Sequence, residues 1–214
     1  MEIELKARVA DPEACRRRLE SLGGKGAAFR KDDGYWFPVN PGAPLPSPSG
    51  LRVRREEKAG VQSVLVTWKT KERRGPLEVN DEREFALAGE AAAPGGETGP
   101  GERFEELLRA LGMERRFRKR KEGWAWNIGG ITAELMEVSG SVPSPGETGA
   151  PRPLGWFLEL EIIPPGADAP GDAGTGEAQA RLLALLEKAG PGTDALESRY
   201  YTELLAEAPG AIPG

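Results

Sequence analysis

The sequence predicts an α+β fold in which helices cover an antiparallel β-sheet that is closed or strongly curved. Most patterned segments alternate polar and apolar residues with a period of two, which is typical of strands with one buried face. Most of these strands follow one another without an intervening helix, which favours antiparallel pairing. The other patterned segments have helical periodicity with one apolar face, and such helices need an apolar surface to cover.

The first half of the chain begins with a strand and a helix. Met1–Val9 alternates charged and apolar residues, so it is predicted to be a strand with one charged face. Asp11 is a predicted N-cap, and the amphipathic helix Pro12–Leu22 that follows ends at the glycine pair 23–24. Alternation and β-branched or aromatic residues predict four further strands, at Ala27–Phe37, Leu51–Glu57, Val61–Lys71 and Glu78–Leu87.

The second half contains a helix, then strands, then helices. Glu102–Gly112 places Phe104, Leu107, Leu108 and Leu111 on one helical face and ends at its glycine. Strands are predicted at Met113–Ile128, Ile131–Val138 and Trp156–Ile163. Two helices complete the pattern, a long one at Glu177–Ala189 and a short one at Glu197–Leu205.

The length of 214 residues suits a single domain, and we expect one domain over residues 1–214. Glycine and proline are concentrated in segments that interrupt the strand and helix pattern. We interpret these segments as flexible insertions within the domain and not as linkers between domains. They are predicted near residues 38–50, 89–101, 139–155 and 164–176.

Composition excludes several classes of chemistry. The chain has no histidine, which excludes serine–histidine and cysteine–histidine catalysis and histidine-ligated zinc. Cys15 is the only cysteine, so no intrachain disulfide can form. The net charge of −5 argues against nucleic acid as a partner, and no apolar run approaches the roughly 20 residues that a membrane span needs. We therefore expect a cytoplasmic protein.

The charged faces of the predicted strands carry both signs. The acidic pairs are Glu2/Glu4, Glu82/Glu84 and Glu159/Glu161, and the basic groups are Lys6, Arg52/Arg54, Lys69/Lys71 and the run Arg118–Lys121. These faces could be solvated outer faces, with surface ion pairs each worth under about 1 kcal/mol. Alternatively they point inward to a polar lumen while the apolar faces lie under the helices. The amphipathic helices favour the second arrangement.

A lumen with many glutamates beside many cations is costly unless it binds a ligand. Arginine and lysine can hold phosphate oxygens, and carboxylates can hold a metal ion. Carboxylates without imidazole or thiolate favour hard cations, meaning Mg²⁺, Mn²⁺ or Ca²⁺, and of these we expect Mg²⁺ or Mn²⁺ as the cofactor. The mixture of signs therefore predicts a polyphosphate ligand bound together with a divalent metal ion.

A series of short motifs resembles the CYTH, or triphosphate tunnel metalloenzyme, family. They occur in the family's order and span nearly the whole chain. The motifs are E-x-E-x-K at Glu2–Lys6, D-x-Y at Asp33–Tyr35, L-R-x-R at Leu51–Arg54, T-x-K at Thr67–Lys69, E-x-E at Glu82–Glu84, G-x-F-x-E-x-E at Gly155–Glu161 and Y-x-E-L-L at Tyr201–Leu205. The first motif alone is weakly specific, whereas the ordered set is strongly specific.

The resemblance implies an eight-stranded antiparallel β-tunnel, a closed barrel with helices packed outside. It implies a catalytic group consisting of Glu2, Glu4, Lys6, Glu82 and Glu84. It implies triphosphate binding by Lys6, Arg52, Arg54, Lys69, Lys119 and Lys121. It implies metal binding by Glu2, Glu4, Glu159 and Glu161. The family usually has an aspartate where this chain has Met136, and Glu134 on the same strand face is the expected substitute. Without that substitution the second metal ion is in doubt.

Three functions follow from the resemblance. The first is hydrolysis of a phosphoanhydride bond in tripolyphosphate, thiamine triphosphate or another triphosphate. The second is a class IV-type adenylyl cyclase that converts ATP to cyclic AMP and pyrophosphate. The third is a triphosphate-binding module that has lost turnover through the Met136 change. The sequence leaves the substrate and the oligomeric state open, as monomer or homodimer.

Overall fold

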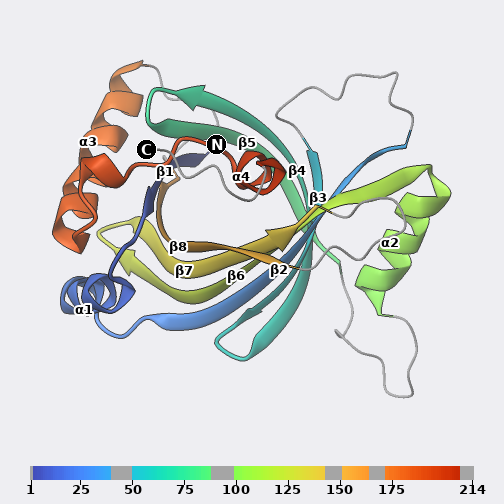
Figure 1. Ribbon diagram of the computed structural model, residues 1–214, viewed down its shortest axis with the longest axis horizontal. Coiled ribbons are helices and arrows are strands. Elements are labelled where there is room, and N and C mark those ends of the chain that lie inside the picture. The colour runs from blue at the N-terminus through green and yellow to red at the C-terminus, as the bar shows by residue number, and fades with distance from the viewer. Residues whose placement is uncertain (1, 40–49, 88–98, 143–150, 164–171, 208–214) are drawn as a thin grey trace.

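The computed structural model describes residues 2–39, 50–87, 99–142, 151–163 and 172–207, in which eight antiparallel strands close into a barrel (Figure 1). The strands are β1 Glu2–Arg8, β2 Ala27–Pro38, β3 Gly50–Lys58, β4 Val61–Arg74, β5 Leu77–Ala86, β6 Met113–Ile128, β7 Ile131–Ser141 and β8 Arg152–Ile162. The helices are α1 Pro12–Gly23, α2 Pro100–Ala110, α3 Asp172–Ala189, α4 Tyr201–Ala206 and the short 3₁₀ helix η1 Thr193–Ala195. The predicted closed eight-stranded antiparallel barrel with helices outside is confirmed.

The barrel closes at its first strand. The strand order is β1-β5-β4-β3-β2-β6-β7-β8, and β8 pairs back onto β1. On β1, Glu4 lies opposite Glu78 of β5 on one side and opposite Glu161 of β8 on the other. Because side chains alternate along every strand, this register brings the charged faces of β1, β5 and β8 to the same side of the wall.

Tight turns with positive φ angles join neighbouring strands. Gly129 and Gly130 connect β6 to β7 with φ angles of 60° and 80°. Two successive positive φ angles are the hairpin geometry that matches the strand twist, and glycine adopts them without steric strain. These turns keep sequence neighbours adjacent in the barrel wall.

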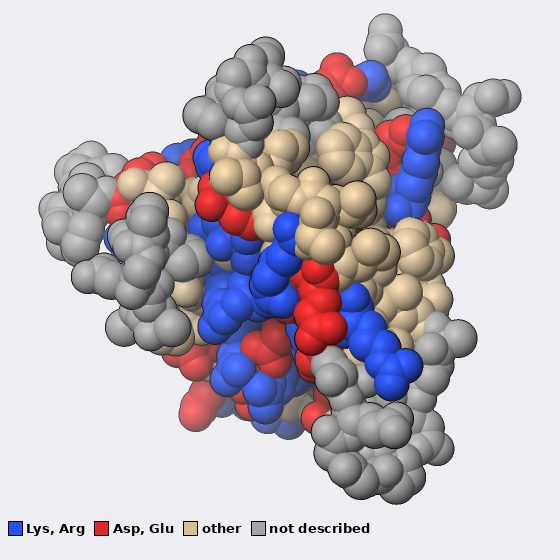
Figure 2. Space-filling model, turned by 90° about the vertical axis from the view of Figure 1, so that its right-hand side faces the viewer, with Lys and Arg blue, Asp and Glu red and all other residues tan. Residues whose placement is uncertain are grey.

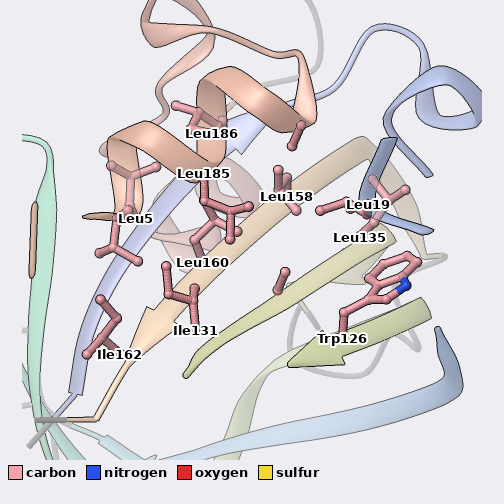
Figure 3. Close-up of a cluster of buried hydrophobic side chains, with 14 of the residues drawn as sticks. Leu5, Leu19, Trp126, Ile131, Leu135, Leu158, Leu160, Ile162, Leu185 and Leu186 are labelled. Atoms are coloured by element: carbon pink, nitrogen blue, oxygen red, sulfur yellow. The ribbon is translucent and has the colours of Figure 1, made fainter. Parts of the chain in front are cut away.

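Apolar side chains on the outer barrel face pack under α1 and α3 (Figure 3). Leu5 of β1 and Leu160 of β8 are fully buried there against Leu186 of α3, and Leu19 of α1 belongs to the same cluster. The alternate residues of β1 and β8 therefore point into the barrel. The charged faces of the strands line a lumen, as the amphipathic pattern of the helices led us to expect.

Leu160→Ala is expected to lower the free energy of unfolding by about 2–5 kcal/mol, because it opens a cavity at a fully buried position between β8 and α3. Urea unfolding of the purified protein measures this. The matched control is Leu107→Ala on α2, where the leucine is 51% exposed and truncation should change stability little. Equal losses in the two variants would contradict this packing.

A second outer cluster lies under α2. Leu108 of α2 is buried against Val53 of β3, Val64 of β4 and Trp36 of β2. Helices cover this side of the barrel less completely, since Phe85 on the outer face of β5 is 55% exposed. None of the described helices is long and apolar enough to cross a membrane.

The predicted insertions fall largely outside the described residues, at 40–49, 88–98, 143–150 and 164–171. Their described edges belong to regular elements, which corrects the predicted bounds. Helix α2 begins at Pro100, β7 continues to Ser141, β8 begins at Arg152 and α3 begins at Asp172. Proline and glycine at a first helical turn, or within an otherwise extended segment, do not prevent the element from forming.

The predicted last helix also begins later than expected. Helix α4 begins at Tyr201, whereas the preceding residues are extended along β1. Leu196 forms a β-bridge with Ala7, and the Glu197 backbone N–H donates to the Lys6 carbonyl at 2.9 Å. Pairing with β1 therefore replaces helical hydrogen bonds over this segment.

Candidate active site

The lumen gathers these cations from four of the eight strands. Lys6, Arg52, Arg54, Lys119 and Lys121 are each only 6–8% exposed, and Lys69 lies among them. Figure 2 views the end of the barrel at the right of Figure 1, where Lys and Arg gather in the hollow centre of the face with Asp and Glu between them. All six predicted triphosphate-binding residues therefore lie inside the same barrel.

Asp33 of β2 holds two of these cations in position. The Arg54 Nε donates to Asp33 Oδ1 at 2.7 Å and Nη2 donates to Oδ2 at 3.0 Å, while Lys119 Nζ lies 3.2 Å from Oδ2. Burial alone would raise the pKa of Asp33, but Arg54 and Lys119 hold it well below its usual range. Lys119 Nζ also donates to the Tyr35 hydroxyl at 2.9 Å. Asp33 and Tyr35 thus orient cations.

Arg52 is held on one side only. Its Nη2 donates to Thr67 Oγ1 at 3.0 Å and to Glu84 Oε2 at 3.3 Å, and Thr67 donates to the same Glu84 oxygen at 2.7 Å. The buried Arg52 Nε has no hydrogen-bond partner among the described residues. A buried donor without a partner is costly, so this edge of the guanidinium suits an anionic ligand.

The two predicted glutamates of β5 contact cations. Glu82 forms a close ion pair with Lys69, which also lies 3.3 Å from Glu2 Oε2. Glu84 is 37% exposed, near the rim, and its contacts are with Thr67 and Arg52. In the structure both carboxylates orient cations, and a direct catalytic role for them stays a prediction.

Glu4 and Glu161 are lumen carboxylates without a direct ion pair among the described residues. Burial, together with Glu159 and Glu78, raises the pKa of Glu4 to about 7. Burial, together with Glu2 and Glu4, raises the pKa of Glu161 to about 8. Within the described part of the chain, no lysine or arginine nitrogen lies within ion-pair distance of either carboxylate. Desolvated carboxylates that repel one another fit the donor chemistry of a hard divalent cation.

The other predicted metal ligands are already paired. Lys121 Nζ donates to Glu159 in a close ion pair, and Lys31 Nζ donates to Glu134 at 2.5 Å. Burial alone would raise the pKa of both carboxyls, but the adjacent lysines lower it. In the residues that the structure describes, no three carboxylates are already arranged around one point. Glu159 and Glu134 thus differ from Glu4 and Glu161 in that each already has a direct ion pair with a lysine.

Three lumen residues are missing from the site predicted by sequence. Lys31 lies on the same face of β2 as Asp33, and Glu78 on the same face of β5 as Glu82, paired with Lys71 at 2.5 Å. Alternation within each strand could have indicated both. Tyr201 comes from α4, and its ring lies 4.4 Å from Lys6 Nζ, 4.9 Å from Lys119 and 5.2 Å from Lys121. Only the tertiary structure could place that ring.

A cavity of about 330 Å³ lies at the mouth of the lumen. One part of its lining is cationic, with Arg52, Lys69, Lys71 and Lys119, and another part is aromatic, with Tyr35, Phe37, Phe117, Tyr200 and Tyr201. The rings of Phe37 and Phe117 are arranged edge to face at 6.0 Å. The mouth therefore offers an apolar surface next to the cationic lumen.

Several proteins of known structure share this fold. The PH1819 protein from Pyrococcus horikoshii has a TM-score of 0.69 at 21% identity, covering 96% of this chain and 98% of that one. A Vibrio parahaemolyticus protein described as a candidate adenylate cyclase has a TM-score of 0.65 at 18% identity, covering 96% and 98%. A Hippeastrum protein reported to have a dominant triphosphatase activity has a TM-score of 0.55 at 15% identity, covering 96% and 95%.

These sequence identities are low, so the structural similarity establishes the shared fold and nothing about function. No curated protein sequence is significantly similar to the chain. The sequence itself matches the CYTH domain over residues 1–201, which is nearly its whole length. The chain therefore belongs to the CYTH family.

Proposed function

We propose that this protein is a metal-dependent enzyme that hydrolyses a phosphoanhydride bond of a triphosphate inside the lumen. The observation that carries the proposal is the division of the lumen by charge. The lumen holds buried cations, including the Arg52 Nε without a hydrogen-bond partner, and it also holds Glu4 and Glu161, which have no direct ion pair with a described residue and whose pKa values are raised. An anionic ligand together with a divalent cation would complement both groups at once.

The lumen cations would bind and orient the substrate. Arg52 and Arg54 present forked donors that match phosphate oxygens, and the Asp33 carboxylate prevents the Arg54 guanidinium from changing its orientation. Lys6, Lys69, Lys119 and Lys121 add point charges around the chain of phosphates. Holding the phosphates in a cationic lumen offsets the charge that develops on their oxygens during transfer.

Glu2, Glu4 and Glu161 would hold the Mg²⁺ or Mn²⁺ ion near the start of β1, where Glu4 lies opposite Glu161 of β8. When bound, such an ion supplies neutralisation of phosphate charge and a bound water of lowered pKa. The lumen side chains then need only position substrate and water, which suits a chain without histidine. We infer no side-chain nucleophile.

The aromatic mouth favours a second candidate, in which the substrate is ATP and the product cyclic AMP. Phe37, Phe117 and Tyr200 line the cavity beside Arg52 and Lys69, so a base or other ring could lie there with its phosphates in the lumen. An organic triphosphate such as thiamine triphosphate would use the same surface under the hydrolase proposal.

One assay separates these candidates. Purified protein is incubated with tripolyphosphate, thiamine triphosphate or ATP, each with Mg²⁺ or Mn²⁺, and phosphate, pyrophosphate and cyclic AMP are followed. Release of phosphate without cyclic AMP supports the hydrolase. Cyclic AMP with stoichiometric pyrophosphate supports the cyclase instead. Absence of any turnover, with tight triphosphate binding, leaves only the binding module.

Phe117→Ala is expected to raise the KM for thiamine triphosphate or ATP by roughly 2- to 12-fold, the equivalent of about 0.5–1.5 kcal/mol for one lost ring contact. The KM for tripolyphosphate, which has no ring, should not change. Phe85→Ala on the outer face of β5 is the control. A parallel change for all three substrates would show that Phe117 acts on the phosphate site and not on a ring.

A further inference from the structure

Lys31 is a buried lysine in the lumen wall that the proposed function does not use. It is 8% exposed, and its Nζ lies 2.5 Å from Glu134 Oε1 and 3.7 Å from Glu56 Oε1. The same ammonium lies 4.8 Å from the centre of the Phe29 ring. Lysine is rarely buried unless paired, and here carboxylates from β3 and β7 hold it on two sides.

Glu134 is the only carboxylate on the inward face of the described strand β7. Met136, the next inward residue of β7, is fully buried in an apolar cluster with Phe29 and Phe157. Glu137 of the same strand is exposed on the outer side. Across the β7–β8 register Glu134 lies opposite Glu159, which Lys121 already holds.

The lumen acids therefore form two groups with different charge balance. Glu134 and Glu159 each have a direct ion pair with a lysine, Lys31 and Lys121, that does not depend on a metal ion. Glu4 and Glu161 have no ion pair with any described residue and lie on β1 and β8, next to Glu2. Only the second pair of carboxylates lacks a direct cationic partner.

We propose that Lys31 is a built-in counter-ion in the place of a second divalent cation, so that the lumen binds one divalent ion, at Glu2, Glu4 and Glu161. This inference rests on the proposed metal-dependent function. A divalent ion at Glu134 would break the short Lys31–Glu134 ion pair and leave the buried ammonium with only Glu56, 3.7 Å away, as an ion-pair partner. Breaking a buried ion pair is strongly unfavourable, so the fixed ammonium excludes the ion.

Titration of the full-length protein with Mn²⁺, with free Mn²⁺ measured by electron paramagnetic resonance, tests this directly. The wild-type chain is expected to bind one Mn²⁺. Lys31→Met removes the ammonium and keeps the volume, so it is expected to bind a second Mn²⁺. Lys31→Arg keeps the charge and should still bind one. The double variant Lys31→Met with Glu134→Gln should return to one, because the second ion needs the Glu134 carboxylate.

Glu134→Gln alone gives a test that does not depend on the folding of Lys31→Met. It is expected to leave the Mn²⁺ stoichiometry and affinity of the wild-type chain unchanged, whereas Glu4→Gln should abolish binding. The proposal is overturned if the wild-type chain binds two Mn²⁺ ions and Glu134→Gln loses one of them. It is also overturned if a folded Lys31→Met variant, checked by circular dichroism, still binds only one.

The result of the Mn²⁺ titration can be distinguished from a failure of the proposed hydrolase function. A protein that hydrolyses no triphosphate but shows these Mn²⁺ stoichiometries contradicts the hydrolase proposal and supports the role of Lys31. A wild-type chain that binds no Mn²⁺, while Lys31→Met gains a Glu134-dependent ion, contradicts the metal site at Glu4 and Glu161. The role of Lys31 would still be supported by that gain.

Discussion

Replacing Arg54 by alanine is expected to lower kcat for triphosphate hydrolysis by roughly 100- to 1,000-fold, the usual effect of removing one donor aimed at developing charge. Arg54 is 8% exposed in the lumen wall, and the bidentate contact with Asp33 leaves its Nη1 available to a phosphate oxygen. Initial rates over a range of substrate concentrations measure kcat and KM separately.

Removing Arg54 also affects folding, because Asp33 keeps only Lys119 as a charged partner. Breaking a buried ion pair from one side costs about 3–5 kcal/mol, so Arg54→Lys is the second variant. It retains the charge but loses the fork, and it should fold while remaining slow. The matched control is Arg120→Ala, since Arg120 lies on the outer face and is paired with Asp32. Full activity in folded Arg54→Lys and Arg54→Ala would contradict an inward-facing catalytic role.

Glu4→Gln is expected to lower activity by at least about 100-fold, because changes to a metal ligand exceed the 10- to 100-fold effects seen for residues that only support one. The amide has nearly the same shape but no charge with which to hold a divalent cation. Activity measured against Mg²⁺ or Mn²⁺ concentration should show a large increase in the metal concentration needed for half-maximal rate.

The same substitution should not unfold the protein. Glu4 lies among Glu78, Glu159 and Glu161 without an ion pair, so a neutral amide removes a buried repulsion. The melting temperature without metal is therefore expected to stay the same or to rise. Glu137→Gln, on the exposed outer face of β7, is the control for the loss of one carboxylate. A Glu4→Gln protein with normal metal dependence would exclude Glu4 as a ligand.

Much of the fold could be predicted from local pattern. Alternation along β1 assigns Glu2, Glu4 and Lys6 to one face, and the apolar stripes of the helices indicate that the opposite face is covered. That Leu5 packs under α3 follows from this pattern, and the structure confirms it. The pattern alone predicted a closed or strongly curved sheet. The family resemblance, based on the order of the motifs, predicted a closed barrel of eight strands, which the structure confirms.

Element bounds were less predictable, because glycine and proline are typical of loops but tolerated in elements. Pro100 starts α2, and Gly140 lies within β7. The predicted helix at Glu197–Leu205 begins only at Tyr201, since long-range pairing with β1 outweighs the helical tendency of the preceding residues. Tertiary hydrogen bonds of this kind are not encoded in a local window.

The sequence by itself favoured the charged strand faces as the lumen wall, because the amphipathic helices need the apolar faces of the strands as a surface to cover. It also determined the membership of the CYTH family, through its match to the CYTH domain over residues 1–201. Only the tertiary structure decided which charges meet. Glu134 was expected to replace the carboxylate missing at Met136, yet Lys31 holds it from a strand 103 residues earlier in the chain. Partner choice inside the lumen depends on barrel register and side-chain reach, and neither is a property of any single segment.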